Sequence, residues 1–432
     1  MRGKWLCSAV VLATAAFVTP SLAEVKPAAQ EGCIECHARE KVAVTAIEEY
    51  RQSAHAKQGV SCVDCHAAAP EEVDGFEHHG TRIATIVTPT DCAQCHEKES
   101  KQFQASHHAK AGQILGSLDN FLGEVIEGAP AAIAGCKQCH GGEVKILPNG
   151  RPDPATWPNT GIGRLNPDGS RGSCTACHSR HNFGAKVARS PESCGKCHLG
   201  PDHPQKEIYE ESKHGIAFFA NRDRMNLGSE SWVLGKDYSA APTCTTCHMG
   251  ATPELPATHD PGERLSWTLR PAVSKKMENW ESKRSAMESV CGNCHSKGFV
   301  GAFYKQYDVT VEHYNDRFAK PAGELMEKLY KAGKLTPTQF DEKIEWTYYL
   351  LWHHEGRRAR HGAAMNAPDY TQWHGFFEVA QRFYLELLPE AEELLPGSTA
   401  FIIDSPEHAW RKGVSPEERE KIRTFYEGRY GK

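Results

Sequence analysis

Cysteine and histidine recur together along the first 300 residues of this 432-residue chain. Sixteen of its 17 cysteines fall in eight copies of one unit, in which two residues separate a pair of cysteines and a histidine follows at once. In chain order the units are Cys33, Cys36 and His37; Cys62, Cys65 and His66; Cys92, Cys95 and His96; Cys136, Cys139 and His140; Cys174, Cys177 and His178; Cys194, Cys197 and His198; Cys244, Cys247 and His248; and Cys291, Cys294 and His295. Only Cys7 lies outside them, so a fold of this chain must accommodate eight identical sets of ligand groups.

The unit is typical of covalent haem attachment. Two thiols on one helical turn form thioethers with the two vinyl groups of a porphyrin, and the next residue presents an imidazole to the iron from the same side. A disulfide framework explains an even number of cysteines but not the histidine after each second one. Zinc sites use such cysteine pairs in twos, and a thioredoxin-like redox centre needs one pair. We therefore predict eight c-type haems.

Fifteen further histidines supply distal ligands to these irons. An iron with two imidazole ligands carries electrons, whereas catalysis needs an open sixth position. The distal ligands that we expect are His55, His79, His108, His181, His214, His259 and His361. His78 and His107 each stand next to one of these and leave the choice open. Because fifteen exceeds eight, the histidine count leaves open whether any haem keeps a free position.

The N-terminus follows the pattern of a secretory signal peptide. Arg2 and Lys4 precede an apolar run over residues 5–18, and Ser21-Leu22-Ala23 follows. We predict cleavage after Ala23 and export of a soluble product to the periplasm. The run is shorter than the about 20 apolar residues of a membrane-spanning helix. A net charge of −5 provides no basic field, so nucleic acid is not an expected partner.

Residues 24–300 are expected to form the octahaem cytochrome domain. Their connections are rich in Pro and Gly, which favours turns over strands. We predict a mainly α, loop-rich fold with the haems as its core. A compact protein of the remaining 409 residues has a radius of gyration of about 22 Å, so eight haems must lie close enough to form one electron conduit.

Residues 301–432 contain no cysteine and follow a helical pattern. Two apolar series predict helices, namely Phe340, Ile344, Tyr348 and Leu351, and then Phe376, Val379, Phe383 and Leu387. Helix starts are predicted at Thr336-Pro337, Ser405-Pro406 and Ser415-Pro416, and Pro389 should end the second helix. We expect this segment to pack on the haem core and to contribute to the active site and to subunit contacts. A plain helical cap is the alternative.

Several segments of the chain resemble the octahaem hydroxylamine oxidoreductase family, which includes hydrazine dehydrogenase-like multihaem cytochromes c. They are residues 157–164 (WPNTGIGR), 174–181, 194–204, 209–215, 360–362 and 368–375. The resemblance spans nearly the whole mature chain, although this chain looks shorter than typical members. It implies that seven haems with two histidine ligands carry electrons, while the fourth haem lacks a distal protein ligand and binds the substrate.

By order along the chain, the resemblance assigns the catalytic haem to Cys136, Cys139 and His140. In oxidative members a tyrosine from a neighbouring subunit of a homotrimer bonds to this haem and makes a P460-type chromophore. Tyr370 is the candidate for that cross-link. The alternative is an aromatic side chain that packs under a helix.

Asp202 and His203 are the candidates for a distal pair that handles the protons of the substrate. The alternative is that the prolines on either side, Pro201 and Pro204, only place them in a turn. Tyr238 is a weaker distal candidate.

The leading hypothesis is a periplasmic oxidoreductase that oxidises hydroxylamine to nitric oxide or nitrite. Its electrons would pass to a cytochrome or to a quinone-linked membrane protein. The first alternative is the reverse reaction, reduction of nitrite or hydroxylamine to ammonium, by relatives that lack the cross-linking tyrosine. Hydrazine oxidation is a third option for the same site. A non-catalytic electron conduit with eight saturated haems is the remaining alternative.

Overall fold

The computed structural model describes residues 27–116 and 121–431, so the predicted signal peptide, with Cys7, lies outside the described residues. Helices dominate this part of the chain, which confirms the predicted mainly α, loop-rich fold. The strands form two antiparallel two-stranded ribbons, β1 (Phe76–His78) with β2 (Thr81–Ile83) and β3 (Trp267–Thr268) with β4 (Lys275–Lys276). None of the described helices is long and apolar enough to cross a membrane.

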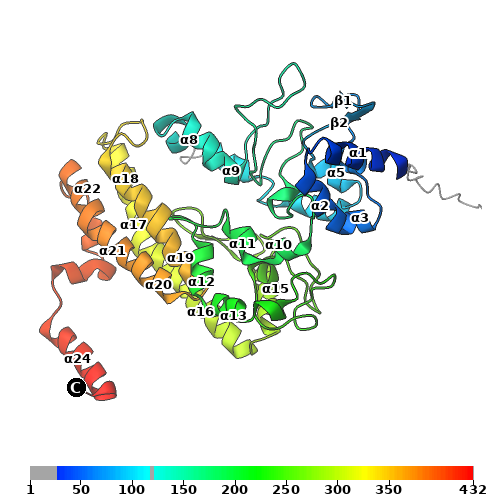
Figure 1. Cartoon of the computed structure of the whole chain (residues 1–432). Helices are drawn as coiled ribbons and strands as arrows, with labels where there is room; N and C mark the ends of the chain where they lie inside the picture. Colours follow the sequence, from blue (N-terminus) through cyan, green and yellow to red (C-terminus); the bar gives the residue numbers. More distant parts are fainter. Residues whose placement is uncertain (1–26, 117–120, 432) are drawn as a thin grey trace, which may run out of the picture.

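Short helices joined by long loops make up the N-terminal part of the molecule (Figure 1). They are α1 (Pro27–Arg39), α2 (Val44–Gln52), α3 (Ala54–Lys57), α4 (Cys62–His66), α5 (Pro89–Ala93), α6 (Glu97–Ala105), η1 (Ala111–Gly116), η2 (Phe121–Ile126), α8 (Ala129–Ala134), α9 (Cys136–His140), η3 (Cys174–Ala176), α10 (Ala185–Arg189), α11 (Pro191–Gly195), α12 (Gln205–Glu211), α13 (Lys213–Ala220), η4 (Arg222–Met225) and α14 (Cys244–His248). The Cys-x-x-Cys-His units form helical turns. In the third unit, for example, the His96 N–H donates to the Cys92 carbonyl over 2.9 Å.

Longer helices form the C-terminal part, drawn from green through yellow to red in Figure 1. They are α15 (Trp280–Gly292), α16 (Lys297–Tyr314), η5 (Asn315–Ala319), α17 (Lys320–Lys331), α18 (Lys343–Tyr349), η6 (Leu350–Glu355), α19 (Gly356–Ala364), α20 (Pro368–Thr371), η7 (Gln372–Phe377), α21 (Glu378–Arg382), η8 (Phe383–Leu387), α22 (Leu388–Leu394), α23 (Ala400–Ile403), η9 (Pro406–Lys412) and α24 (Pro416–Tyr430). Leu325, Leu351, Phe383 and Leu387 lie in one fully buried apolar cluster of this bundle. Helix α24 buries none of its residues and extends away from the bundle (Figure 1).

Four π-helical turns, η5 to η8, interrupt the helices of this bundle without breaking them. Helices α18 and α19 continue one another through η6, so residues 343–364 are helical throughout. A π turn inserts one extra residue into a helix and changes which side chains share a face, and such turns are frequent at functional sites.

The predicted helix starts have different outcomes. Ser415 caps α24, with its side chain accepting a hydrogen bond from Glu418 N–H, and Ser405 precedes the 3₁₀ helix η9, so both starts are confirmed. The start at Thr336-Pro337 is wrong, because the Thr336 hydroxyl donates to Asp341 within a turn and the helix begins only at Lys343.

The predicted helix end at Pro389 is also wrong. Helix α22 carries this proline in its first turn and continues to Leu394. The π turn η8 lies directly before α22 and shifts the hydrogen-bonding register. The missing N–H of Pro389 therefore falls where a new helical segment starts, and a proline is tolerated there.

Replacing Phe383 by alanine should lower the free energy of unfolding by about 3–5 kcal/mol, because the ring is fully buried and lies 5.4 Å from that of Phe318, ring to ring. Leu385→Ala is the matched control in the same π turn. Its side chain is 67% exposed, so the change should stay within about 0.5 kcal/mol. Denaturant titration of the haem-loaded protein, followed by circular dichroism, measures both; equal losses would contradict the packing described.

Candidate functional site

The thiols of different haem-binding units are electrostatic neighbours of one another. Electrostatic contacts link Cys33 with Cys62, Cys65 with Cys92, Cys177 with Cys194, and Cys247 with Cys291; hydrogen bonds link Cys92 with Cys174 and Cys194 with Cys244. In space the units therefore follow the order first, second, third, fifth, sixth, seventh and eighth. The fourth unit joins this row at the sixth, where the Cys139 and Cys197 thiols are hydrogen-bonded. None of the sixteen described cysteines is paired in a disulfide.

Five of the unit histidines face a second imidazole. The ring centroids are 6.0 Å apart for His37 and His78, 6.4 Å for His66 and His181, and 6.1 Å for His96 and His55, His198 and His108, and His295 and His214. Four of the proposed distal ligands, His55, His108, His181 and His214, are thus each beside one unit histidine.

The other three proposed ligands are placed differently. His259 is an electrostatic neighbour of His178 in the fifth unit. The His79 ring lies 4.7 Å from that of His78, which is the imidazole nearer to His37, so the choice in this pair stays open. His361 is half-buried, and its Nε2 accepts a hydrogen bond of 3.3 Å from the Gln205 amide.

The donor set fits haem iron in two respects. First, Nδ1 of the unit histidines His66 and His248 lies 2.9 Å from the Ala84 carbonyl and 3.1 Å from the Pro261 carbonyl. A carbonyl only accepts, so each Nδ1 carries the proton and Nε2 is left for a metal. Second, burial lowers the pKa of His108 and of His198 to about 4, which keeps both rings in the neutral form that binds metals.

A glycine-rich segment clamps the fourth unit. Ile162 N–H donates to the Cys139 carbonyl and Gly163 N–H to the His140 carbonyl, over 3.0 and 3.2 Å. A Cβ at Gly161 would lie 2.1 Å from the Gly141 amide nitrogen, so no side chain fits at that position. Arg164 is buried and donates to the Asn159 carbonyl, which closes the segment on itself. The WPNTGIGR segment thus has a structural role next to helix α9.

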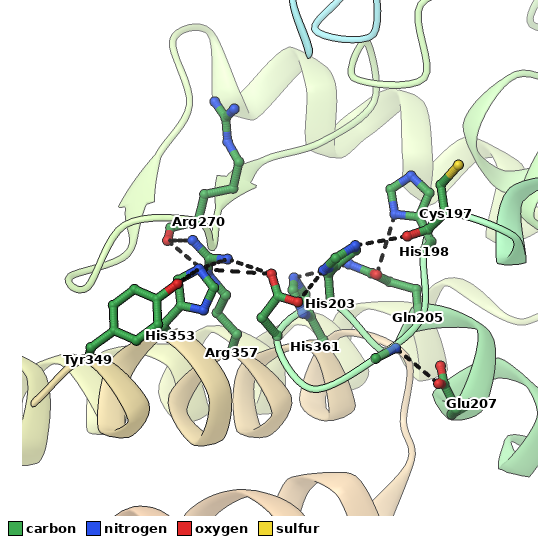
Figure 2. Close-up of polar contacts among 12 residues, drawn as sticks. Cys197, His198, His203, Gln205, Glu207, Arg270, Tyr349, His353, Arg357 and His361 are labelled. Carbon is green, nitrogen blue, oxygen red and sulfur yellow. Dashed lines mark hydrogen bonds and ion pairs between the residues drawn. The ribbon is translucent and has the colours of Figure 1, made fainter. Parts of the chain in front are cut away.

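Asp202 and His203 lie beside the fourth and sixth units. The charge of His203 acts on the Cys139 thiol. His203 Nδ1 lies 2.5 Å from Asp202 Oδ1, and its Nε2 lies 2.8 Å from the Cys197 carbonyl (Figure 2). Both partners are acceptors, so both ring nitrogens carry protons and the ring is an imidazolium.

The pKa values of this pair agree with that protonation state. Burial acts to lower the pKa of His203, but the hydrogen bond and the charge of Asp202 outweigh burial and raise it. Burial would likewise raise the pKa of Asp202, yet His203, His353 and Arg357 together lower it to about 2. Both shifts therefore favour a carboxylate paired with an imidazolium.

Two residues of the C-terminal segment complete the site, and sequence reasoning missed both. Arg357 on α19 donates to Asp202 Oδ2 over 3.0 Å, and His353 in η6 lies 3.0 Å from the same guanidinium nitrogen (Figure 2). Both side chains are buried. A spacing of four from Tyr349 through His353 to Arg357 was the available signal, although other charged residues of the same helical run make it weak.

The two tyrosine candidates lie elsewhere. The Tyr370 ring on α20 is half-buried, lies 5.4 Å from the His374 ring, and has a pKa raised by burial and by Glu207 and Glu211 of α12. Tyr238 is buried against Trp232 and donates to Thr246, which belongs to the seventh unit. The structure thus puts Tyr238 at the seventh unit, not at the fourth, and we do not retain it as a distal residue.

Comparison with known proteins gives three overlapping family matches. Residues 167–342 match a family described as seven times multi-haem cytochrome CxxCH, residues 85–199 match cytochrome c3, and residues 40–127 match cytochrome c552. A probable nitrite reductase-hydroxylamine oxidoreductase fusion protein of Kuenenia stuttgartiensis is 25% identical over 368 residues, covering 71% of this chain. The match spans 38% of the length of that relative.

Two solved structures share the fold. A hypothetical multiheme protein is 25% identical and superposes with a TM-score of 0.74, over 86% of this chain and 98% of its own. A reducing HAO-like protein complex of Kuenenia stuttgartiensis is 20% identical with a TM-score of 0.64, over 85% of each chain.

The imidazole pair at the eighth unit allows a direct test of ligation. In His214→Met we expect one haem to change from two histidine ligands to histidine and methionine, which raises its reduction potential. His313→Met is the control, because its ring lies 5.6 Å from Phe376 in the C-terminal bundle. A redox titration measures the reduction potentials of the haems in both variants, and near-infrared spectra identify their axial ligands. If His214→Met leaves all haems unchanged, His214 is no ligand.

Proposed function

Because the chain is a multihaem cytochrome c of the hydroxylamine oxidoreductase-like (HAO-like) family, we propose that it is an octahaem oxidoreductase that acts on small nitrogen compounds. Its substrate site is the haem of Cys136, Cys139 and His140, and the other seven haems, with two histidine ligands each, carry the electrons. The reaction that the geometry supports best is reduction of hydroxylamine or nitrite to ammonium. The protein works in the periplasm, and a cytochrome or a quinone-linked membrane protein supplies the electrons.

One observation supports reduction of the substrate over its oxidation. Reduction of these compounds consumes protons, whereas oxidation of hydroxylamine releases them. His203, an electrostatic neighbour of Cys139, has an acceptor at each ring nitrogen, so it carries both protons and has no free lone pair to act as a base; it gives a proton to the substrate when one N–H leaves its acceptor. The name of the similar Kuenenia complex, a reducing HAO-like protein, points the same way.

The bound haem would supply an iron that exchanges electrons with the nitrogen atom of the substrate. The chain supplies the protons and the enclosure. Asp202 keeps His203 charged and oriented, so the imidazolium is the group that gives a proton to a substrate oxygen or nitrogen. The WPNTGIGR segment fixes helix α9, and with it the attachment point of this haem.

The row of thiol contacts supports the electron-carrying role. Each unit from the first to the eighth has another unit as an electrostatic neighbour, and the fourth unit adjoins the sixth. Electrons that enter at either end of the row therefore have a continuous path to the substrate site.

Replacing His203 by glutamine should lower the rate of hydroxylamine reduction by about 10²–10⁴-fold, because the proton donor is lost. In the wild type, activity should hold at pH values below the raised pKa of His203 and fall as the pH passes above it. Asp202→Asn removes the charge that raises this pKa, so the falling limb should move to lower pH. Ammonium formation with a reduced viologen dye, measured against pH, tests both variants.

Cyanide binding is the control for this experiment. An enzyme with one open haem should bind one cyanide per eight haems, and a pure electron conduit should bind none. Unchanged ammonium formation in His203→Gln would show that His203 is not the proton donor. An absence of cyanide binding would show that no haem has an open sixth position.

Hydroxylamine oxidation remains the second candidate because Tyr370 is present. If a partner subunit offers this tyrosine to the fourth haem in a homotrimer, the cross-linked P460-type haem would favour electron withdrawal from the substrate, which is hydroxylamine or hydrazine. Trp373 and Phe377 are about half exposed on the next turns of the same helix, which suits a subunit contact.

Absorption spectra of the reduced protein separate the two directions. We expect no P460-type band in the wild type, and Tyr370→Phe should leave the spectrum and the reductive rate unchanged. A P460-type band that disappears in Tyr370→Phe would instead establish the cross-link and the oxidative direction.

A further inference from the structure

A buried arginine, Arg357, binds Asp202 in addition to His203. His203 binds Oδ1 of the carboxylate, and Arg357 Nη1 donates to Oδ2 over 3.0 Å. The two oxygens of Asp202 are thus divided between an imidazolium from its own loop and a guanidinium from helix α19. Rotation of the carboxylate about its last torsion angle would break both contacts at once.

Arg357 is itself fixed by the backbone. Its Nε and Nη2 donate to the Arg270 carbonyl over 3.1 and 2.8 Å. Its Nη1 also donates to His353 Nε2, and the Tyr349 hydroxyl lies 3.1 Å from that same nitrogen. Only 9% of the Arg357 side chain is exposed, so water has little access to these contacts.

The shape of the side chain is essential to this arrangement. A guanidinium presents its donors in a rigid planar arrangement. The Nε and Nη2 atoms of Arg357 therefore bind the Arg270 carbonyl while Nη1 binds Asp202 and His353. A lysine would keep the positive charge, but its single ammonium cannot reach both the carbonyl and the carboxylate in that geometry.

We propose that Arg357 is a positioning residue that fixes the orientation of Asp202 and, through it, the orientation and the charge of the His203 ring. This inference rests on the proposed function, in which His203 gives the proton. Arg357 does not touch the substrate. It couples the C-terminal helices to the haem site, because its guanidinium joins α19, the loop that carries Arg270, and the loop that carries Asp202.

The test compares Arg357→Lys with a matched control, Arg284→Lys. Arg284 also has a side chain that is 9% exposed, and it binds the carboxylate of Asp308 through two hydrogen bonds of 3.2 and 2.7 Å. We expect Arg357→Lys to lower kcat for hydroxylamine reduction about 10–100-fold, with KM changed less than about threefold, because only alignment is lost. Arg284→Lys should leave both constants near the wild-type values.

A spectroscopic readout makes the test independent of turnover. Carbon monoxide bound to the one open haem of the reduced protein reports a nearby proton donor, because a hydrogen bond to its oxygen lowers the C–O stretching frequency. In the wild type we expect one narrow, lowered band. In Arg357→Lys the band should broaden and move to higher frequency, as in Asp202→Asn, while Arg284→Lys keeps the wild-type band.

The double variant Asp202→Asn with Arg357→Lys decides whether Arg357 acts through Asp202. If it does, the double variant should be no more than about twofold slower than Asp202→Asn alone, since coupled residues are not additive. Additive losses, or a normal rate and C–O band in Arg357→Lys, would overturn the inference while the proposed function stands. Normal turnover in Asp202→Asn and His203→Gln would instead overturn the proposed function.

Discussion

Contact between the thiols of successive haem-binding units is the constraint on which the rest of the N-terminal half depends. Each unit holds two thiols and an imidazole on one helical turn, and each turn lies near another in space, the third near the fifth and the fourth near the sixth. The polypeptide between the turns has only to bring them together, which explains the short helices and long loops. Side-chain packing of the ordinary kind is concentrated in the C-terminal bundle, around residues such as Leu351 and Phe383. The molecule thus combines a half organised by prosthetic groups with a half organised by apolar side chains.

Asp202 lies where these two halves meet. Its loop follows directly from the sixth unit, and its carboxylate is bound by an arginine of the bundle. The bundle can hold that arginine steadily because Arg357 and the fully buried Arg360 both donate to carbonyls of residues 270–271. A buried ion pair is costly unless every hydrogen-bonding group is satisfied, and here the guanidinium donates to a carbonyl, a carboxylate and an imidazole. Because these hydrogen bonds are formed, the buried guanidinium of Arg357 is held in a single orientation.

The sequence predicts the haem-binding units well, because the two cysteines and the histidine that hold a haem lie within five consecutive residues. It does not predict their order in space, since the contact of Cys139 with Cys197 depends on the whole path of the chain. The choice between His78 and His79 depends on local backbone geometry, and the turn at Thr336 depends on a side-chain contact that competes with helix initiation. Asp202 and His203 are recognisable by family resemblance. Arg357 and His353 belong to no short motif, and an arginine in a helix is more often a surface residue.

The π turn that carries His353 makes the length of this helix part of the site. Residues 343–364 form a continuous helical run, and successive residues of a helix are rotated by about 100° around its axis. Loss of one residue from that turn would leave composition and helicity almost unchanged, yet it would close the π turn and change which side chains around it share a face. The number of residues in this turn is therefore as much a part of the site as the identity of its side chains.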